Sequence, residues 1–305
     1  MAEIKKILIA NRGEIVQRAI RTIREMGKKS VAVYSAGDKN ASYLKHADEA
    51  VCIGGPKSKD SYLNIPAIIT AAEMTGCDAI FPGYGFLSEN QDFVEICRLH
   101  NIKFIGPSVE VMEKMADKSK AKEEMIRAGV PVVPGSKGAV HSVTEGKKVA
   151  LEIGYPIMAK AAAGGGGRGM RLIKEESEFD QLFMAASSEA LAAFGDGTMY
   201  LERFINNPRH IEVQVVGDSH GNAIHIGERD CSLQRRHQKV IEESPAILLN
   251  DETRAKLHDV AVKATKYLKY EGAGTFEFLA DDKQNIYFME MNTRLQVEHP
   301  VSEMV

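Results

Sequence analysis

Hydrophobic positions in the first 107 residues alternate between short apolar runs and stretches with apolar residues at helical spacing. The short runs predict strands at residues 4–10, 30–35, 50–53, 78–81 and 103–106. The helical spacing predicts helices at residues 15–26, 64–76 and 90–100. Strands that alternate with helices are typical of an open parallel sheet, so we predict an α/β domain for residues 1–107.

Two loops follow predicted strands of this sheet at their carboxyl ends. They are "ANRGE" at residues 10–14 and "PGYGFLSEN" at residues 82–90. Ligands of open parallel sheets bind at this edge. The two loops are therefore the part of the first domain in which we expect binding residues.

The hydrophobic pattern changes after Pro107. Two helices are predicted within residues 108–128, and the Pro- and Gly-rich "GVPVVPGS" that follows indicates a domain joint. A small α/β unit is predicted for residues 132–204. The remaining predicted strands are residues 209–217, 222–232, 238–246, 272–280 and 285–292, with one helix at residues 251–269. This pattern favours a mostly antiparallel sheet with helices on one face.

Inside the small unit, "KAAAGGGGRGMRLI" at residues 160–173 places a glycine run at the tip of a predicted hairpin. Its literal GxGxxG match is not a dinucleotide fingerprint, because a strand follows it instead of a helix. The HRD and DFG motifs of kinases and the Walker A motif are absent. Glycines leave backbone N–H groups bare, and Lys160 and Arg168 add positive charge, so the loop suits phosphate oxygens better than a plain surface loop.

Near the C-terminus, "YFMEMNTRLQVEHP" alternates apolar and polar residues. Glu290 and Asn292 share one face of the predicted strand, and Glu277 projects between two phenylalanines of the preceding strand. Carboxylate and amide oxygens near phosphates are typical Mg²⁺ ligands. A solvated strand face is the alternative. The same parity continues through Arg294, Gln296 and Glu298 if the chain stays extended.

A basic segment, "ERDCSLQRRHQK" at residues 228–239, holds three arginines, a histidine and a lysine. Alone it would be interpreted as a solvated turn, but beside a phosphate loop and a metal site it favours an anion pocket. In "NPRHIEVQVV", His210, Glu212 and Gln214 share one face of a predicted strand. The "YLERF" segment at residues 200–204 is a candidate hinge strand.

Composition excludes several classes of protein. The 305 residues carry a net charge of −3, with 44% hydrophobic and 27% charged residues, which argues against nucleic acid or a membrane surface as the main partner. No apolar run is long enough to span a bilayer. The four cysteines show no CxxC spacing, so we expect reduced thiols and a cytoplasmic protein.

Taken together, these stretches resemble the biotin carboxylase family of the ATP-grasp superfamily. The markers occur in order along essentially the whole chain: "ANRGEI", "FPGYGFLSEN", "GGGGRGM", "NPRHIEVQV", "ERDCSLQRRHQK", "GTFEF" and "EMNTRLQVEHPV". The resemblance implies an α/β fold with four parts. They are an N-terminal Rossmann-like, pre-ATP-grasp domain at 1–107, a helical linker at 108–131, an ATP-grasp lid subdomain at 132–204 and a truncated central sheet at 205–305.

The resemblance also implies an activity. Members of this family form carboxyphosphate from bicarbonate and ATP with Mg²⁺ or Mn²⁺, and then carboxylate biotin on a biotin carboxyl carrier protein. Carboxyltransferase subunits and a homodimer of the full-length chain are implied partners. Acetyl-CoA carboxylase of fatty acid synthesis is the parent complex that we expect.

Residue roles follow from the matching motifs. The implied ATP contacts are Lys118, Lys160, Gly166, Gly167, Glu202, Arg203, Phe204, Ile205, His210, Gln234 and His237. The implied Mg²⁺ ligands are Glu277, Glu290 and Asn292. The implied bicarbonate site comprises Lys239, Arg294, Gln296 and Val297, with Glu298 as the base that deprotonates bicarbonate.

Two departures from the family pattern affect these expectations. Ala162 and Ala163 stand where the family usually has Ser-Gly, so slower or altered lid closure is expected. The chain also ends at Val305, where the family continues, and we expect an inactive fragment. Two alternatives stay open: an ATP-grasp ligase for another carboxylate, related to carbamoyl-phosphate synthetase, and a non-catalytic nucleotide-binding fragment.

Overall fold

The computed structural model describes residues 3–161, 169–236 and 238–305. The chain forms two compact units, and each is described by itself. The first unit comprises residues 1–130, 210–278 and 289–305, and the second comprises residues 131–209 and 279–288.

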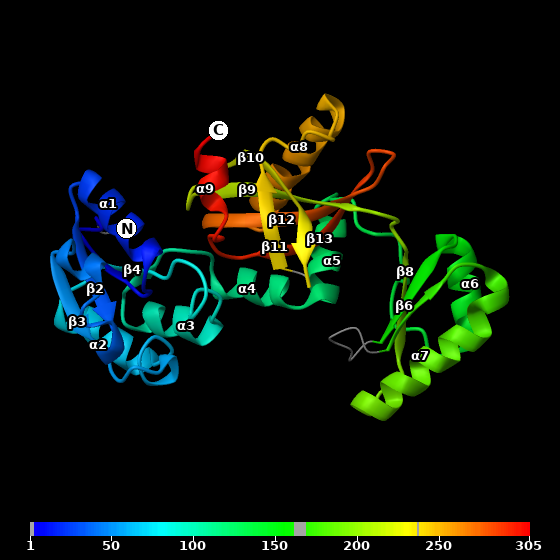
Figure 1. Cartoon of the computed structure of the whole chain (residues 1–305), viewed down its shortest axis with the longest axis horizontal. Helices are drawn as coiled ribbons and strands as arrows, with labels where there is room; N and C mark the ends of the chain where they lie inside the picture. The colour runs from blue at the N-terminus through cyan, green and yellow to red at the C-terminus, as the bar shows by residue number, and fades with distance from the viewer. Residues whose placement is uncertain (1–2, 162–168, 237) are drawn as a thin grey trace. The chain divides into compact units, whose positions relative to one another are not determined.

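The first unit begins with a five-stranded parallel sheet in the order β3-β2-β1-β4-β5. Figure 1 labels β2, β3 and β4 of this sheet. Its strands are β1 (Lys6–Ile9), β2 (Lys29–Tyr34), β3 (Glu49–Cys52), β4 (Ala79–Phe81) and β5 (Lys103–Phe104). Its helices are α1 (Glu14–Glu25), α2 (Ile65–Met74) and α3 (Gln91–Leu99). Each predicted strand and helix of residues 1–107 is confirmed, with ends that differ by a few residues.

Alternation along β1 divides the core of this sheet between its two faces. Ile7 and Ile9 pack with the buried face of α1, whereas Leu8 lies in the cluster that contains the buried residues of α2 and α3. Side-chain caps define two helix starts, since Asn64 and Asn90 accept backbone N–H bonds from the first turns of α2 and α3.

Two helices lead out of this sheet, α4 (Val109–Ala116) and α5 (Lys118–Arg127), as the sequence predicts. The 3-10 helices within the described residues are η1 (Ala36–Asp38), η2 (Ser42–Lys45), η3 (Ser58–Asp60) and η4 (Glu176–Glu178). They were not predicted, because such short turns carry no periodic signal.

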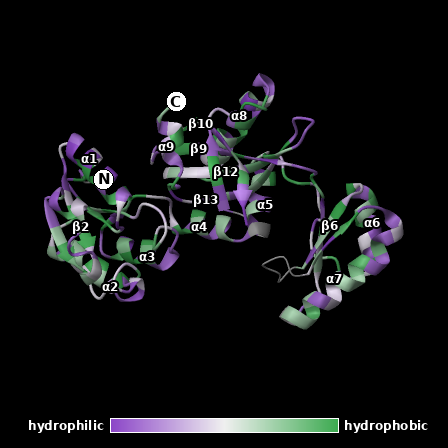
Figure 2. Cartoon of the chain, viewed as in Figure 1, coloured by the Kyte–Doolittle hydropathy of each residue, from purple (hydrophilic) through white to green (hydrophobic). Residues whose placement is uncertain are grey.

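A second five-stranded sheet has the order β11-β10-β9-β12-β13. Its strands are β9 (Arg209–Gly217), β10 (Ala223–Arg235), β11 (Gln238–Glu243), β12 (Gly272–Ala280) and β13 (Ile286–Asn292). The β9, β10 and β11 pairs are antiparallel, and α8 (Asp251–Tyr267) packs against β10. This confirms the predicted sheet and helix. The polar turn "DDKQN" between β12 and β13 is coloured as hydrophilic in Figure 2.

A short helix, α9 (His299–Glu303), follows this sheet and was not predicted. The chain leaves the extended conformation after Asn292, and Glu298 at the N-cap of α9 has φ −79° and ψ 3°. The expectation of an extended chain through Glu298 is therefore wrong. A turn followed by a helix, which the alternation of residue types does not encode, replaces the strand.

The second unit has a three-stranded sheet, β7-β6-β8, with two helices. Its elements are α6 (Val143–Ile153), β6 (Ile157–Ala161), β7 (Met170–Ile173), α7 (Phe179–Phe194) and β8 (Met199–Arg203). The β6–β7 pair is antiparallel, with Lys160 opposite Met170, so the predicted hairpin is confirmed. The buried core includes Phe179 and Phe183 from α7, whose rings stack 5.3 Å apart.

Candidate active site

Three carboxylates converge on one lysine in the first unit. Lys239 Nζ lies 2.5 Å from Glu212 Oε2, 2.6 Å from Glu298 Oε1 and 3.0 Å from Glu277 Oε1. An ammonium group has three N–H donors, so these carboxylates use all of them. We call Lys239 and these three glutamates the lysine cluster.

Four chain segments bring the lysine cluster together. Glu212 lies on β9, Lys239 on β11, Glu277 on β12 and Glu298 immediately before α9. Burial of the cluster strengthens each charge interaction, because little water screens it. Glu212 is fully buried, Glu277 is 4% exposed, and the Lys239 side chain is 18% exposed.

The electrostatics of the cluster follow from this geometry. Burial would lower the pKa of Lys239, but the neighbouring carboxylates of Glu212 and Glu277 outweigh it and raise that pKa. Burial would likewise raise the pKa of Glu277, but His210 and Lys239 lower that pKa to about 2. The cluster therefore holds a charged ammonium against charged Glu277.

Glu277 is also the meeting point of the predicted metal ligands and the predicted bicarbonate residues. Asn292 Nδ2 donates to Glu277 Oε1 at 2.8 Å, and Gln296 Nε2 donates to the same oxygen at 3.1 Å. Glu290 lies two residues before Asn292 on β13, which places both on the same face of that strand. These carboxylate and amide groups fit the hard oxygen ligands that Mg²⁺ prefers.

His210, predicted to contact ATP, borders the lysine cluster from β9. His210 Nε2 lies 2.8 Å from Glu277 Oε2, and Gln234 Nε2 lies 3.0 Å from His210 Nδ1. Gln234 also donates to the Cys231 carbonyl at 2.9 Å. The Gln234 amide thus holds the His210 ring with its Nε2 edge facing Glu277.

Arg294 is held from the first domain. Arg294 Nε donates to Glu89 Oε2 at 2.8 Å, and Arg294 Nη2 donates to Asn292 Oδ1 at 3.3 Å. Glu89 belongs to the "PGYGFLSEN" loop, which the sequence places at the binding edge of the parallel sheet. Glu89 also accepts from the backbone N–H of Thr293 at 3.1 Å. This loop therefore fixes the turn that replaces the expected strand.

The second unit carries the other predicted nucleotide residues. Lys160 Nζ on β6 lies 2.5 Å from Glu202 Oε2 on β8, and the two residues belong to adjacent antiparallel strands. Arg203 donates from Nε and Nη2 to the Ile153 carbonyl, at 3.2 Å and 2.6 Å. The Arg203 side chain thus supports its own unit. Phe204 donates its backbone N–H to the Pro156 carbonyl at 2.9 Å, and Ile205 is 9% exposed.

Four predicted residues lie wholly or partly outside the described residues. Gly166, Gly167 and His237 lie outside the described residues, as does the side chain of Lys118, whose backbone begins α5. Val297 is described and is 60% exposed.

Sequence reasoning missed two supporting residues, Glu89 and Ser302, and it placed Arg229 only among the basic residues of a candidate anion pocket. Arg229 is fully buried beside Glu212, and Glu89 pairs with Arg294. Ser302 on α9 accepts from Arg229 Nη1 at 2.8 Å. The alternation of β9 places Glu212 and Gln214 on one face with His210. Two polar residues inside a buried strand indicate that a buried hydrogen-bond partner lies nearby.

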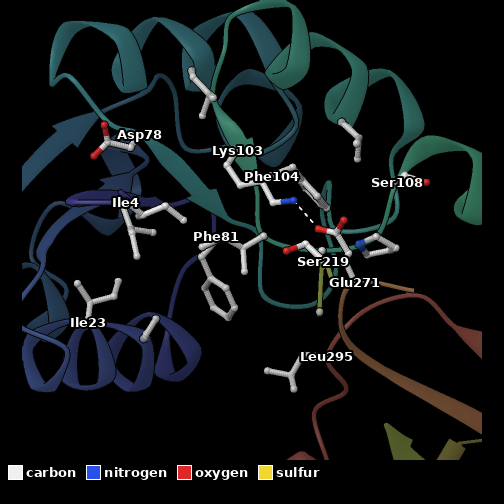
Figure 3. Close-up of a pocket in the computed structure, with 18 of the residues that line it drawn as sticks. Ile4, Ile23, Asp78, Phe81, Lys103, Phe104, Ser108, Ser219, Glu271 and Leu295 are labelled. Atoms are coloured by element: carbon white, nitrogen blue, oxygen red, sulfur yellow. Dashed lines mark hydrogen bonds and ion pairs between the residues drawn. The ribbon is translucent and has the colours of Figure 1, made fainter. Parts of the chain in front are cut away.

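A separate cavity of about 1120 Å³ lies in the first unit among α1, β5, the start of β12 and the segment before α9. Figure 3 shows Ile4, Phe81 and Leu295 around it, with the 2.5 Å ion pair between Lys103 and Glu271 on one side. None of the predicted site residues is among the described residues that line this cavity. The lysine cluster is therefore a distinct site.

The parallel domain, the glycine hairpin and the charged antiparallel sheet together define an ATP-grasp protein, and family comparisons agree. Residues 3–112 match "Biotin carboxylase, N-terminal domain", and residues 117–305 match "Carbamoyl-phosphate synthase L chain, ATP binding domain". The chain is 58% identical to the biotin carboxylase of Nostoc sp. over 300 residues, which cover 98% of this chain and 67% of that protein. The chain belongs to the biotin carboxylase family.

Solved structures share this fold. The biotin carboxylase of Campylobacter jejuni, in its β,γ-ATP complex, is 68% identical with a TM-score of 0.85, covering 99% of this chain and 68% of that chain. The biotin carboxylase domain dimer of Hydrogenobacter thermophilus 2-oxoglutarate carboxylase, with MgADP, ADP and bicarbonate, is 51% identical with a TM-score of 0.81. That match covers all of this chain and 67% of the other. The predicted α/β fold and family are thus confirmed.

The same comparisons limit the finer assignment. The chain spans 57% and 56% of the length of the chloroplastic biotin carboxylases of Populus trichocarpa and Arabidopsis thaliana. Its relatives also include the α subunit of mouse methylcrotonoyl-CoA carboxylase, at 53% identity over 99% of this chain and 42% of that protein. Among the helices described, none has the length and hydrophobicity needed to cross a membrane.

Proposed function

We propose that the complete protein carboxylates the biotin group of a biotin carboxyl carrier protein, using ATP and bicarbonate through carboxyphosphate. One observation carries the proposal: the lysine cluster places the predicted base Glu298 and the predicted metal ligand Glu277 on one ammonium group. Membership of the biotin carboxylase family supports it.

Each predicted residue has a chemical task in this proposal. Mg²⁺, held by Glu277, Glu290 and Asn292, would neutralise charge on the ATP phosphates. Glu298 would take the proton of bicarbonate, because the bicarbonate oxygen becomes a good nucleophile only after deprotonation. Arg294 and Lys239 would hold the substrate anion and stabilise negative charge as it develops.

The proposed parent complex is acetyl-CoA carboxylase, with carrier and carboxyltransferase subunits, a homodimeric biotin carboxylase subunit and a cytoplasmic location. The relatives include 2-oxoglutarate and methylcrotonoyl-CoA carboxylases. The molecule that finally accepts the carboxyl group is therefore tested directly. The complete protein would be combined with candidate carrier and carboxyltransferase subunits, and carboxylated acetyl-CoA, pyruvate and 2-oxoglutarate would be measured. Product from acetyl-CoA alone is the expected result.

The carboxylation step is tested by ATP hydrolysis in the complete protein. We expect hydrolysis to require bicarbonate and Mg²⁺ and to increase with free biotin. ATP hydrolysis that requires ammonia and does not increase with biotin would instead favour a ligase related to carbamoyl-phosphate synthetase. Nucleotide binding without turnover would favour a non-catalytic protein. For the 305-residue chain we expect nucleotide binding without biotin-dependent turnover.

A further inference from the structure

Arg229 on β10 is the largest fully buried side chain of the described residues, and its guanidinium joins four partners. Nε donates to Glu212 Oε1 at 2.6 Å, and Nη2 donates to Gln296 Oε1 at 3.0 Å. Nη1 donates to Ser302 Oγ at 2.8 Å and to Gln214 Oε1 at 3.1 Å. Four of its five N–H donors are thus directed at Glu212 of the lysine cluster and at three groups beside the cluster.

The first effect of Arg229 is on the orientation of the Gln296 amide. Because Gln296 Oε1 accepts from the guanidinium, Nε2 must turn the other way, where it donates to Glu277 Oε1 at 3.1 Å. A flipped amide would set its NH₂ against the N–H groups of Arg229, which has no acceptor. Arg229 therefore decides which end of Gln296 faces Glu277.

The second effect is on Glu212, which lies directly opposite Arg229 in the β9–β10 register. Arg229 takes one carboxylate oxygen, and Lys239 takes the other at 2.5 Å. The planar guanidinium fixes the carboxylate in a way that a point charge does not. Glu212 thus transmits the position of Arg229 to Lys239.

The third effect is on the segment that carries Glu298. Gln296 lies two residues before Glu298, and Ser302 lies four residues after it on α9. Arg229 binds both, so one rigid group fixes the backbone on each side of the proposed base.

We propose that Arg229 is the positioning residue of this site: it orients Gln296, Glu212 and the start of α9 so that Lys239 and Glu298 are held where bicarbonate would bind. This inference rests on the proposed function, because that function assigns Lys239 and Glu298 to bicarbonate. Arg229 itself contacts no substrate in this proposal. A residue that only stabilises the core would change the stability of the protein without changing substrate affinity in the folded fraction.

The test uses Arg229→Lys in the complete protein, because lysine keeps the charge and loses the planar group of donors. We expect the KM for bicarbonate to rise about 10-fold or more, while the KM for ATP changes less than about 3-fold, a loss of orientation of the kind that misplaced groups produce. Arg254→Lys is the matched control, since Arg254 Nε lies 2.9 Å from Oε1 of buried Glu228. Arg254 also donates to Asp251, Ala246 and Leu249, and none of these residues belongs to the lysine cluster. This control should leave both KM values unchanged.

Ser302→Ala keeps the test decisive if Arg229→Lys does not fold, because it removes only the α9 contact. We expect a rise of about 2- to 5-fold in the KM for bicarbonate, in line with one lost hydrogen bond. Unchanged KM values in all folded variants would overturn the inference.

A structural readout separates this inference from the proposed function. In a crystal structure of Arg229→Lys, or of Ser302→Ala if only that variant folds, we expect Gln296 or the Glu298 backbone to move. If neither Gln296 nor the Glu298 backbone moved, Arg229 would not be a positioning residue, whatever reaction the protein catalyses. Wild-type protein without bicarbonate-dependent hydrolysis would instead refute the proposed function, and the crystal structure alone would then decide the positioning role.

Discussion

Lys239 and Glu298, 59 residues apart in the chain, meet with 2.6 Å between Nζ and Oε1. Glu298 shares Lys239 with two other carboxylates, so a bound anion would have to take over one of the lysine's donors. The cluster thus occupies the three N–H donors of Lys239, which is proposed to hold bicarbonate. This competition links the charge balance of the cluster to both stability and activity.

Glu298→Gln in the complete protein removes the proposed base and retains shape and hydrogen bonding. Bicarbonate-dependent ATP cleavage should fall by about 10²-fold or more, the usual scale for a lost general base. ATP affinity, measured by calorimetry, should change little. Glu303→Gln, in the helix that Glu298 caps, is the control and should retain activity, because Glu303 pairs with Arg18 and His299 and not with the lysine cluster. Near-normal turnover of Glu298→Gln at saturating bicarbonate would assign the base to another residue.

Lys239→Met leaves three carboxylates close together without their shared cation. The free energy of unfolding should fall by about 3–5 kcal/mol at pH 8, the range for a broken buried ion pair. The deficit should shrink toward pH 3, because Lys239 helps to lower the pKa of Glu277 to about 2, and the stability that a lowered carboxyl pKa provides is lost as the pH falls from about 4.3 toward 2.

Urea denaturation at both pH values measures this effect. Lys103→Met removes the more exposed pair with Glu271, and it should cost at most about 1 kcal/mol at either pH. A pH-independent deficit in Lys239→Met would contradict the charge argument.

Glu228 predicts a second acid-sensitive contribution to stability. Burial would raise the pKa of this 2% exposed carboxyl, but hydrogen bonds from His258, Arg254 and the Ala246 N–H lower that pKa to about 2. A lowered carboxyl pKa stabilises the folded protein above the unfolded-state value of about 4.3, and that stability is lost as the pH falls toward 2.

Glu228→Gln should therefore flatten the decline of stability between about pH 5 and pH 3, and lower stability at pH 7 by about 1–3 kcal/mol, as for hydrogen bonds to a charged group. Thermal unfolding across this pH range provides the measurement. Equal acid slopes for wild type and variant would show that Glu228 does not contribute.

Nucleotide should slow hydrogen exchange at residues 160–172, because Lys160 and the glycine run are predicted to bind phosphate. Exchange would be measured with and without MgATP, and α2 in the first unit provides an internal reference. Lys160→Met, which also removes the 2.5 Å pair with Glu202, should abolish most of the protection. Identical exchange with and without nucleotide in the wild type would count against the lid assignment.

The sequence alone determined most of the strands, the long helices of the first domain and many of their faces. Alternation placed Glu290 with Asn292 on β13 and His210 with Glu212 on β9, because side chains of a strand point to opposite faces in turn. Strand-like apolar residues on both sides of a glycine run predicted the hairpin of β6 and β7. Family resemblance added the roles of these residues, and the comparisons confirm the family.

Only the tertiary structure decided which charged and polar groups pair with one another. Glu89 meets Arg294 from 205 residues away, and Arg229 finds Glu212 across a strand pair and Ser302 on a helix that was not predicted. Residue periodicity is a property of neighbours along the chain and carries no information on such distant partners. Burial makes these pairs important for stability, because a buried charge without a partner costs free energy.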